Sequence, residues 1–225
     1  EAAHSCRKPL IHVVDDDESL RAALLRLLAA ARIDARGYAS AGEFLLNPPE
    51  DRPGCLLLDL KMPGPSGMEL HAALPSLGIT LPVVFLTGHG DVHTGVRAMK
   101  GGAVDFLTKP VERETLLIAL QRAVERDIAQ RAARDEARKL AARFAVLSER
   151  ERLVFDRIVD GLLNKQIADY LGVSERTVKA DRAQVMAKLG VSSTAELGRI
   201  AERLKRSAAD GCLRLMQRNV TPERD

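Results

Sequence analysis

The feature that most constrains the fold is a series of short apolar runs separated by helical patterns. The runs are Leu10–Val14, Gly54–Leu60, Leu81–Leu86 and Val104–Leu107. Between the first two, Ser19–Ala31 has leucines at helical spacing. Continuous apolar runs are typical of strands buried on both faces, and strands that alternate with helices form parallel sheets with helices on both sides. We therefore predict a doubly wound α/β domain.

A long helix is predicted after this domain. Residues Arg113–Leu147 contain neither Gly nor Pro and consist mostly of Ala, Arg, Glu and Leu. An apolar stripe is predicted at Leu117, Leu120, Val124 and Ile128, but alanines replace it further along the helix. A coiled-coil dimer would need three or four sustained heptads, so we favour a solvated connector over a dimer seam.

Short helices are predicted after the connector. Ser148–Glu151 and Ser193–Glu196 both match the capping box, in which a Ser and a Glu side chain satisfy free backbone N–H groups at a helix start. Asn164–Leu171 and Glu175–Leu189 are two helical stretches separated only by Gly172–Ser174. A separation of about three residues is what a helix-turn-helix requires.

Composition agrees with two soluble units. The chain has 225 residues, of which 46% are apolar and 29% charged, which is enough for a packed core. Acidic residues are in excess up to about residue 120, and basic residues are in excess from 121 to 206. The apolar runs are far shorter than the roughly 18 residues of a membrane span, and the beginning of the chain does not resemble a secretory signal. We therefore expect no membrane association and a cytoplasmic location.

Each predicted strand ends next to a residue with functional chemistry. In chain order these residues are Asp15 with Asp16, then Asp59, Thr87 and Lys109. The ligand site of a parallel sheet lies at the carboxyl ends of its strands, so we expect these side chains to converge. Crowded carboxylates repel one another unless a cation lies among them, and Mg²⁺ prefers oxygen ligands. Asp59 could then act as a nucleophile toward a phosphoryl group, with charge neutralised by Mg²⁺ and Lys109 and a hydrogen bond donated by Thr87.

Up to about residue 125 the sequence resembles the receiver domains of bacterial two-component response regulators, whose fold is a flavodoxin-like five-stranded parallel sheet. The motifs that carry the resemblance are Val14–Asp16, Leu58–Pro63, Thr87–Asp91, Ala98–Phe106 and Lys109–Pro110. The resemblance implies that Asp59 is the phosphoacceptor for a sensor histidine kinase. It also implies that Asp15, Asp16 and Asp59 hold Mg²⁺ together with the backbone carbonyl of Lys61.

The same resemblance assigns further roles. Thr87 and Lys109 would bind the phosphoryl group, and Phe106 falls at the family's aromatic switch position, although an ordinary core Phe would also be buried there. The peptide bond before Pro110 is expected to be cis, a form that only X–Pro bonds adopt at low cost. Asp17 and Glu18 are interpreted as caps of the following helix, and His89 as a loop residue.

The stretch Glu175–Leu189 predicts a helix with two distinct faces. At 100° per residue, Val178, Val185 and Leu189 fall within about 40° of one another and form a core stripe. The opposite face consists of Arg176, Ala180, Ala183 and Ala187, flanked by Lys179 and Gln184. Small residues bordered by long polar ones allow close entry into a DNA major groove. Ser174 would cap this helix, and Thr177 and Lys165 are expected to contact phosphates. A helical bundle with a solvated charged face is the alternative.

Residues 145–206 resemble the LuxR-type DNA-binding domain. The resemblance rests on Leu147–Glu151, Gly161–Ala168, Leu171–Ser174 and Thr177–Lys179. It implies that Lys179, Ala180 and Ala183 face the groove and that the last helix, Thr194–Leu204, forms a dimer contact on activation. Asp181 stands where many family members have a histidine, and an acid facing the DNA backbone would repel phosphate, although an Asp can also accept a hydrogen bond from cytosine N4. We therefore expect a weakened or altered contact at Asp181.

Together these features predict a transcription regulator of the FixJ/NarL class that binds promoter DNA, with RNA polymerase as a candidate partner. We predict a receiver at 9–125, a helical linker at 126–144, a DNA-binding domain at 145–206 and a tail at 207–225. The alternatives are a Mg²⁺-dependent phosphohydrolase with an aspartyl-phosphate intermediate and a phosphorylation-controlled adaptor that binds protein. Haloacid-dehalogenase-like phosphohydrolases need a second acid two residues after the nucleophile. Lys61 occupies that position, so we expect no turnover enzyme.

Overall fold

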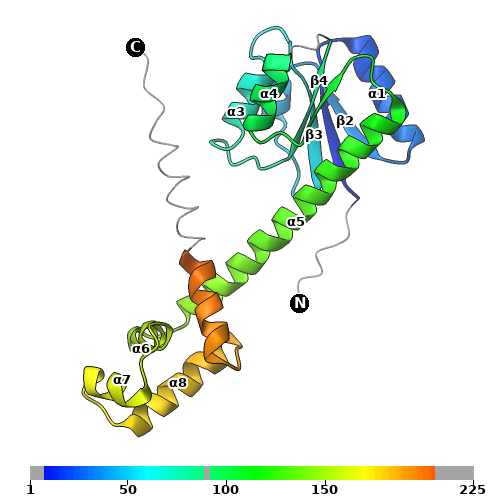
Figure 1. Ribbon diagram of the computed structural model, residues 1–225. Coiled ribbons are helices and arrows are strands. Elements are labelled where there is room, and N and C mark those ends of the chain that lie inside the picture. The colour runs from blue at the N-terminus through cyan, green and yellow to red at the C-terminus, as the bar shows by residue number, and fades with distance from the viewer. Residues whose placement is uncertain (1–7, 89–91, 206–225) are drawn as a thin grey trace. The chain divides into compact units, whose positions relative to one another are not determined.

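The computed structural model describes residues 8–88 and 92–205 (Figure 1). The chain divides into two compact units, one ending at Arg131 and the other beginning at Ala132. The helix α5 (Arg113–Ala145) contributes residues to both units. Each unit is described by itself.

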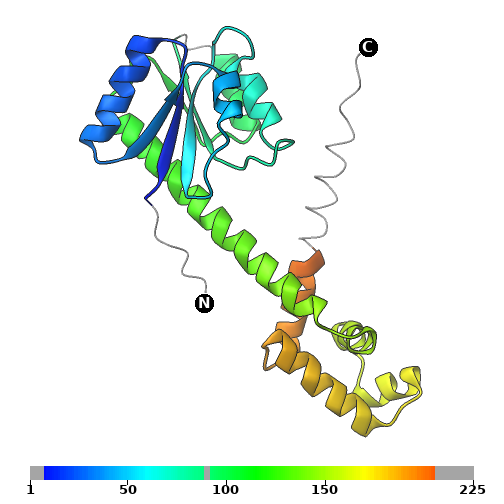
Figure 2. The same cartoon turned by 180° about the vertical axis from the view of Figure 1, so that it is seen from behind.

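The first unit is a parallel five-stranded sheet with the strand order β2-β1-β3-β4-β5. Its strands are β1 (Leu10–Val14), β2 (Asp34–Tyr38), β3 (Gly54–Asp59), β4 (Val83–Thr87) and β5 (Asp105–Thr108). The other helices are α1 (Glu18–Ala30), α2 (Ala41–Leu46), α3 (Gly67–Ala73) and α4 (Val92–Lys100). One apolar core joins the sheet to α1 and α5, and a second joins it to α2, α3 and α4, so helices cover both faces (Figures 1 and 2). The predicted doubly wound fold is confirmed.

Strand β2 is the strand that the apolar pattern did not predict. Its sequence, Asp-Ala-Arg-Gly-Tyr, is largely polar, and Tyr38 is its one fully buried residue. β2 lies at an edge of the sheet and pairs with β1 from Leu10 opposite Asp34 to Val14 opposite Tyr38. An edge strand has fewer neighbours to bury it, so it needs no continuous apolar run. The five-strand count was therefore correct through the family resemblance and not through the apolar runs.

Helix α5 begins at the predicted Arg113 and ends at Ala145, two residues before the predicted Leu147, and its buried face differs from the predicted stripe. The fully buried apolar residues on the receiver side are Leu116, Ala119, Leu120 and Ala123. Of the predicted stripe, Leu120 is buried, Leu117 and Val124 are partly buried, and Ile128 is exposed. Alanine allows a helix to approach a sheet closely, and a stripe chosen by its large apolar residues misses this contact face.

A buried carboxylate fixes α5 near the end of the first unit. Asp127 is fully buried and accepts hydrogen bonds from the N–H of Gly54 at 3.0 Å and from Nε of Arg131 at 2.7 Å. Arg131 also donates to Asp51 at 2.6 Å. A Cβ at Gly54 would lie 2.2 Å from the Leu10 carbonyl oxygen, so glycine is required where β3 begins. The helix is therefore held to the same strand that carries Asp59 at its other end.

The second unit consists of the end of α5 from Ala132, α6 (Glu149–Val159), α7 (Asn164–Leu171), α8 (Glu175–Leu189) and a helix at 194–205 (Figure 1). Its core contains the predicted stripe of Val178, Val185 and Leu189. The capping box of Ser148 and Glu151 is confirmed. The one predicted for Ser193 and Glu196 is half correct, because the Glu196 carboxylate accepts the N–H of Ser192 instead. No helix in the described part of the chain is long and apolar enough to cross a lipid bilayer.

Strand β1 carries a buried histidine, His12, in the first unit. His12 is 2% exposed, its Nδ1 lies 2.9 Å from the hydroxyl of Tyr38, and its ring contacts Phe44. Burial lowers the pKa of His12 to about 4, with a further contribution from the nearby Arg36 and Arg52 cations. The neutral imidazole is therefore the form that the folded protein stabilises.

We predict that His12 makes the stability of the first unit pH-dependent. Because its folded pKa lies below the unfolded value of 6.5, protonation favours the unfolded chain, and stability falls as the pH drops from 6.5 toward 4. Between pH 7 and pH 5 this group should remove about 2 kcal/mol from the free energy of unfolding. Urea unfolding of wild type and His12→Gln at both pH values measures the difference. The same pH dependence in both proteins would contradict the prediction.

Candidate functional site

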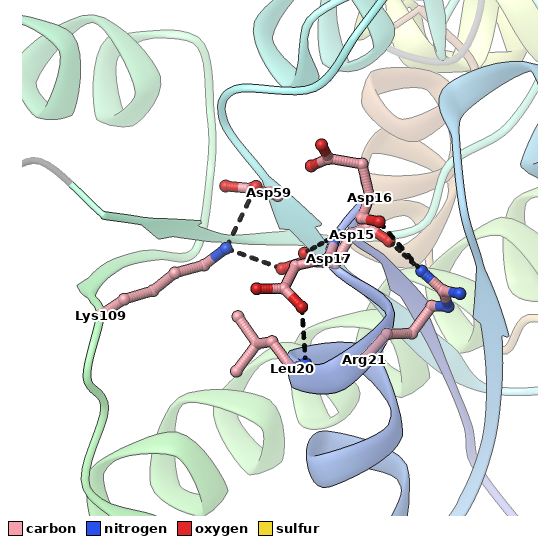
Figure 3. Close-up of polar contacts among 7 residues, drawn as sticks. All are labelled: Asp15, Asp16, Asp17, Leu20, Arg21, Asp59 and Lys109. Atoms are coloured by element: carbon pink, nitrogen blue, oxygen red, sulfur yellow. Dashed lines mark hydrogen bonds and ion pairs between the residues drawn. The ribbon is translucent and has the colours of Figure 1, made fainter.

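The carboxyl edge of the sheet brings together two buried carboxylates and a lysine. Asp15 directly follows β1, Asp59 ends β3, and Lys109 directly follows β5. Nζ of Lys109 lies 2.8 Å from Oδ2 of Asp15 and 3.1 Å from Oδ2 of Asp59 (Figure 3). The Asp15 and Asp59 side chains are 2% and 8% exposed, and that of Lys109 is 20% exposed. One cation therefore bridges two carboxylates from different strands.

The loop after β1 is held by its own hydrogen bonds. The N–H of Asp17 donates to Oδ1 of Asp15 at 3.0 Å, and Arg21 donates to the Asp15 carbonyl at 2.7 Å. Asp17 caps α1 by accepting the N–H of Leu20, as predicted (Figure 3). These bonds fix the direction of Asp15 and leave the neighbouring Asp16 exposed at the mouth of the site.

Three carboxylates are close enough to share one cation. Oxygen atoms of Asp15, Asp16 and Asp59 lie within 4.8 Å of one another, two of these residues being buried and Asp16 exposed. Oxygen donors of this kind suit a hard divalent ion such as Mg²⁺, which keeps part of its coordination for water or phosphate. The donor set therefore fits the predicted metal.

Burial and charge compete at this site. Burial raises the pKa of Asp59 above its usual range, while Lys109 and a backbone hydrogen bond from Lys61 oppose the rise. Burial alone would lower the pKa of Lys109, but its hydrogen bonds to Asp15 and Asp59 raise it. Lys109 therefore stays protonated at neutral pH and compensates the buried negative charge.

Thr87 lies on β4, which pairs with β3, and Phe106 lies on β5, which pairs with β4. Thr87 is fully buried at the end of β4, and its carbonyl accepts the N–H of Lys109 at 2.7 Å. Phe106 on β5 is partly buried and packs against the core under α4, where a Cβ at Gly95 would lie 3.3 Å from its ring. The peptide bond between Lys109 and Pro110 is cis, as expected. His89 lies outside the described residues.

Sequence reasoning missed Gly67, which positions the strand end that carries Asp59. Gly67 is the first residue of α3, and a Cβ there would lie 2.1 Å from the Asp59 carbonyl oxygen. Its N–H donates to the Leu60 carbonyl at 3.1 Å. A single glycine at a helix start gives no signal by itself, because the close approach depends on how α3 packs against β3.

The second unit presents the predicted DNA-facing residues on its surface. The exposed residues are Lys165, Ser174, Arg176, Lys179, Ala180, Ala183 and Gln184, and Thr177 is partly buried. Ser174 caps α8 by accepting the N–H of Thr177 at 3.2 Å, and the two hydroxyl groups lie 2.8 Å apart. The exposed face of α8 is therefore the predicted one, with small residues bordered by long polar ones.

Asp181 is not an isolated acid on this face. Its Oδ2 accepts a hydrogen bond from Nε of Arg150 on α6 at 2.8 Å, and its side chain is only 17% exposed. Nothing in the sequence pattern indicates this pairing, because the two residues are 31 positions apart. The expectation of a weakened or altered DNA contact at Asp181 stays a prediction, and the ion pair shows that part of the Asp181 charge is compensated within the protein.

Comparisons with known proteins agree with both halves of this description. Residues 11–121 match the family described as the response regulator receiver domain, and residues 145–201 match the family described as bacterial regulatory proteins, luxR family. Nodulation protein W of Bradyrhizobium diazoefficiens is 43% identical over 201 residues, which cover 89% of this chain and 88% of that protein. The transcriptional regulatory protein FixJ of Rhizobium meliloti is 44% identical over 191 residues, covering 85% and 94%.

The solved structure of the response regulator StyR is similar over both units. It has a TM-score of 0.76 and 42% sequence identity, and the match covers 87% of this chain and 99% of that one.

We predict that removal of the Lys109 cation destabilises the first unit in a pH-dependent way. Lys109→Gln leaves Asp15 and Asp59 without their counter-charge and should lower the free energy of unfolding at pH 7 by about 2 kcal/mol, a value reduced for partial solvent screening. In the variant the folded pKa of Asp59 rises further, so stability returns as the pH falls through that raised pKa.

Urea unfolding at pH 7 and pH 5 tests this, with the exposed Lys61→Gln as the control. The deficit of Lys109→Gln should shrink at pH 5, whereas Lys61→Gln should match wild type at both values. A deficit of equal size at both pH values would contradict the charge explanation.

Proposed function

The chain belongs to the two-component response regulators that join a receiver domain to a LuxR-type DNA-binding domain, and we propose that Asp59 is its phosphoacceptor. It is a phosphorylation-dependent transcriptional regulator. The observation that carries the assignment of Asp59 is the bridge from Lys109 to Asp15 and Asp59 at the edge of the sheet. This bridge holds a carboxylate beside a fixed cation, where charge on an incoming phosphoryl group can be neutralised.

The proposed reaction is transfer of a phosphoryl group from a phosphohistidine of a sensor histidine kinase. An oxygen of Asp59 attacks phosphorus, the O–P bond forms, and the N–P bond of the phosphohistidine breaks, with its electron pair passing to the imidazole. Lys109 neutralises charge on the phosphoryl oxygens, since such transfers depend mainly on positioning and electrostatics. Thr87 donates a hydrogen bond to the acquired group.

Asp15, Asp16 and Asp59 would hold Mg²⁺, together with the backbone carbonyl of Lys61. The spacing of the three carboxylates supports this assignment. When bound, the ion supplies positive charge against the phosphoryl oxygens. Asp15 also orients Lys109 through the 2.8 Å contact, so the same carboxylate serves both cations.

The proposed switch connects Thr87 to Phe106. A ligand shifts an equilibrium only by making different contacts in the two states, and here these are the contacts of Thr87 and Lys109 with the phosphoryl group. Movement of Thr87 would free the space that the Phe106 ring then enters. The partly buried position of Phe106 over Gly95 supports its ability to move.

We propose that the second unit binds DNA through the exposed face of α8. Lys179, Ala180 and Ala183 would face the major groove with Arg176 and Gln184 beside them, while Lys165, Ser174 and Thr177 would contact phosphates. Homodimerisation on activation through the helix at 194–205, and contact with RNA polymerase, complete the proposal.

The proposed domain limits are 9–125 for the receiver, 126–144 for the linker, 145–206 for the DNA-binding domain and 207–225 for the tail. The proposed role is regulatory, with the receiver acting only on its own phosphoryl group. Lys61 in place of a second acid supports this reading over a phosphohydrolase.

We predict that Mg²⁺ stabilises the protein through the three carboxylates. A ligand at ten times its Kd should add about 1.4 kcal/mol to the free energy of unfolding. Thermal unfolding with and without Mg²⁺ should show this gain in wild type and in Asp17→Asn, which keeps a competent helix cap, and should show a smaller gain in Asp16→Asn. If Mg²⁺ stabilises Asp16→Asn as much as wild type, Asp16 is not a ligand of the metal.

We predict that acetyl phosphate with Mg²⁺ adds one phosphoryl group to wild type and none to Asp59→Asn. The amide lacks the nucleophilic oxygen charge that the reaction needs. Intact-mass spectrometry measures the product, and Asp17→Asn is the control that should be labelled as wild type is. Equal labelling of Asp59→Asn and wild type would refute the assignment of Asp59.

A further inference from the structure

Two ion pairs join the beginning of α6 to α8. Arg150 donates to Asp181 at 2.8 Å, and the next residue, Glu151, accepts from Nζ of Lys188 at 2.7 Å. In the first pair α6 supplies the cation and α8 the carboxylate, and in the second pair the signs are reversed. Asp181 and Lys188 are seven positions apart and so lie two turns apart on one side of α8. A shift of α6 along α8 would bring like charges together, so the pairs fix the register of the two helices.

The pair of Glu151 and Lys188 has a structural explanation. Glu151 is buried and completes the capping box with Ser148, and the hydrogen bond from Lys188 lowers its pKa. Arg150 differs, because its side chain is 46% exposed. A buried partner needs its counter-charge for stability, whereas an exposed ion pair contributes little. Stability alone therefore gives a weak reason for the pair of Arg150 and Asp181.

The position of Asp181 brings Arg150 to the edge of the DNA-facing side of α8. On a helix, Asp181 neighbours Thr177, four residues before it, and Gln184, three residues after it. Both neighbours belong to the surface assigned to DNA. Since the Arg150 guanidinium lies 2.8 Å from Asp181, a cation from α6, outside the helix-turn-helix, is held at this edge.

The guanidinium geometry leaves donors for a second anion. Arginine has five N–H donors in a rigid planar fork. Among the hydrogen bonds of the described residues, Arg150 uses Nε toward Asp181 and neither of its Nη groups. A carboxylate on the Nε side therefore orients the group while the Nη side can bind a phosphate. A lysine in this position has a single ammonium, which could not bind both anions with the same geometry.

We propose that Arg150 contacts a DNA phosphate and that Asp181 is the positioning residue that holds its guanidinium beside α8. This inference rests on the DNA binding of the proposed function and adds a contact from α6 to it. In this proposal the Asp181 carboxylate favours DNA binding, because it orients a cation that contacts the DNA.

The test uses the full chain and a short mixed-sequence DNA duplex, since a phosphate contact does not depend on base sequence. Fluorescence anisotropy measures affinity across a salt series. Arg150→Ala should weaken binding by roughly tenfold. It should also reduce the slope of log affinity against log salt by about 0.9, the value for one phosphate contact.

Arg150→Lys separates fork geometry from charge. The DNA affinity of Arg150→Lys should fall nearly as far as that of Arg150→Ala, although the positive charge is kept. Arg152→Lys is the matched control on the same helix, because Arg152 donates to the Ala145 carbonyl and lies over the ring of Phe144. It should bind as wild type does. Circular dichroism and thermal unfolding establish that each variant is folded. Wild-type affinity in Arg150→Lys would overturn the proposed fork contact.

A double-mutant cycle tests Asp181. We compare the change in DNA affinity that Asp181→Ala causes in wild type with the change that it causes in Arg150→Ala. The change should be at least about threefold more favourable in Arg150→Ala, because the unpaired carboxylate of that variant only repels DNA. Equal effects in both backgrounds would show two independent charges and overturn the positioning role. If wild type does not bind the duplex at low salt, the proposed DNA-binding function is overturned. If wild type binds and every Arg150 variant binds equally well, only the proposed Arg150 contact is overturned.

Discussion

The contact on which the site depends is that of one lysine with two buried carboxylates. Lys109 follows β5, while Asp15 and Asp59 come from β1 and β3, so the contact needs three strands in the correct order and register. Two carboxylates this deeply buried would repel each other without a cation. The parallel sheet supplies the geometry, since the carboxyl ends of its strands meet at one edge. Loop bonds from Asp17 and Arg21 then hold Asp15 in place.

The second unit uses charge in a related way. Arg150 and Glu151 are adjacent on α6 and pair with residues of opposite sign on α8. In both units a cation, Lys109 or Arg150, is positioned by a carboxylate that lies far from it in the sequence. The exposed pair of Arg150 and Asp181 contributes little to stability, so its value lies in placing a cation where a DNA phosphate is expected to bind.

Sequence patterns predicted most of the fold because apolar periodicity and helix caps act locally. The runs around β1, β3, β4 and β5, the long helix α5 and the core stripe of α8 were all visible in this way. The polar edge strand β2 was not, because its burial depends on β1. The close approach of Gly67 to Asp59 and the pairing of Arg150 with Asp181 were also missed, because both depend on tertiary packing across elements.

The central claim is that a phosphoryl group on Asp59 controls DNA binding by the second unit. The most direct measurement is the affinity of the full chain for promoter DNA before and after treatment with acetyl phosphate and Mg²⁺, in wild type and in Asp59→Asn. A coupling of ordinary size would change the wild-type affinity by about fivefold or more and leave Asp59→Asn unchanged. An identical response in the two proteins, or no response in fully phosphorylated wild type, would contradict the account.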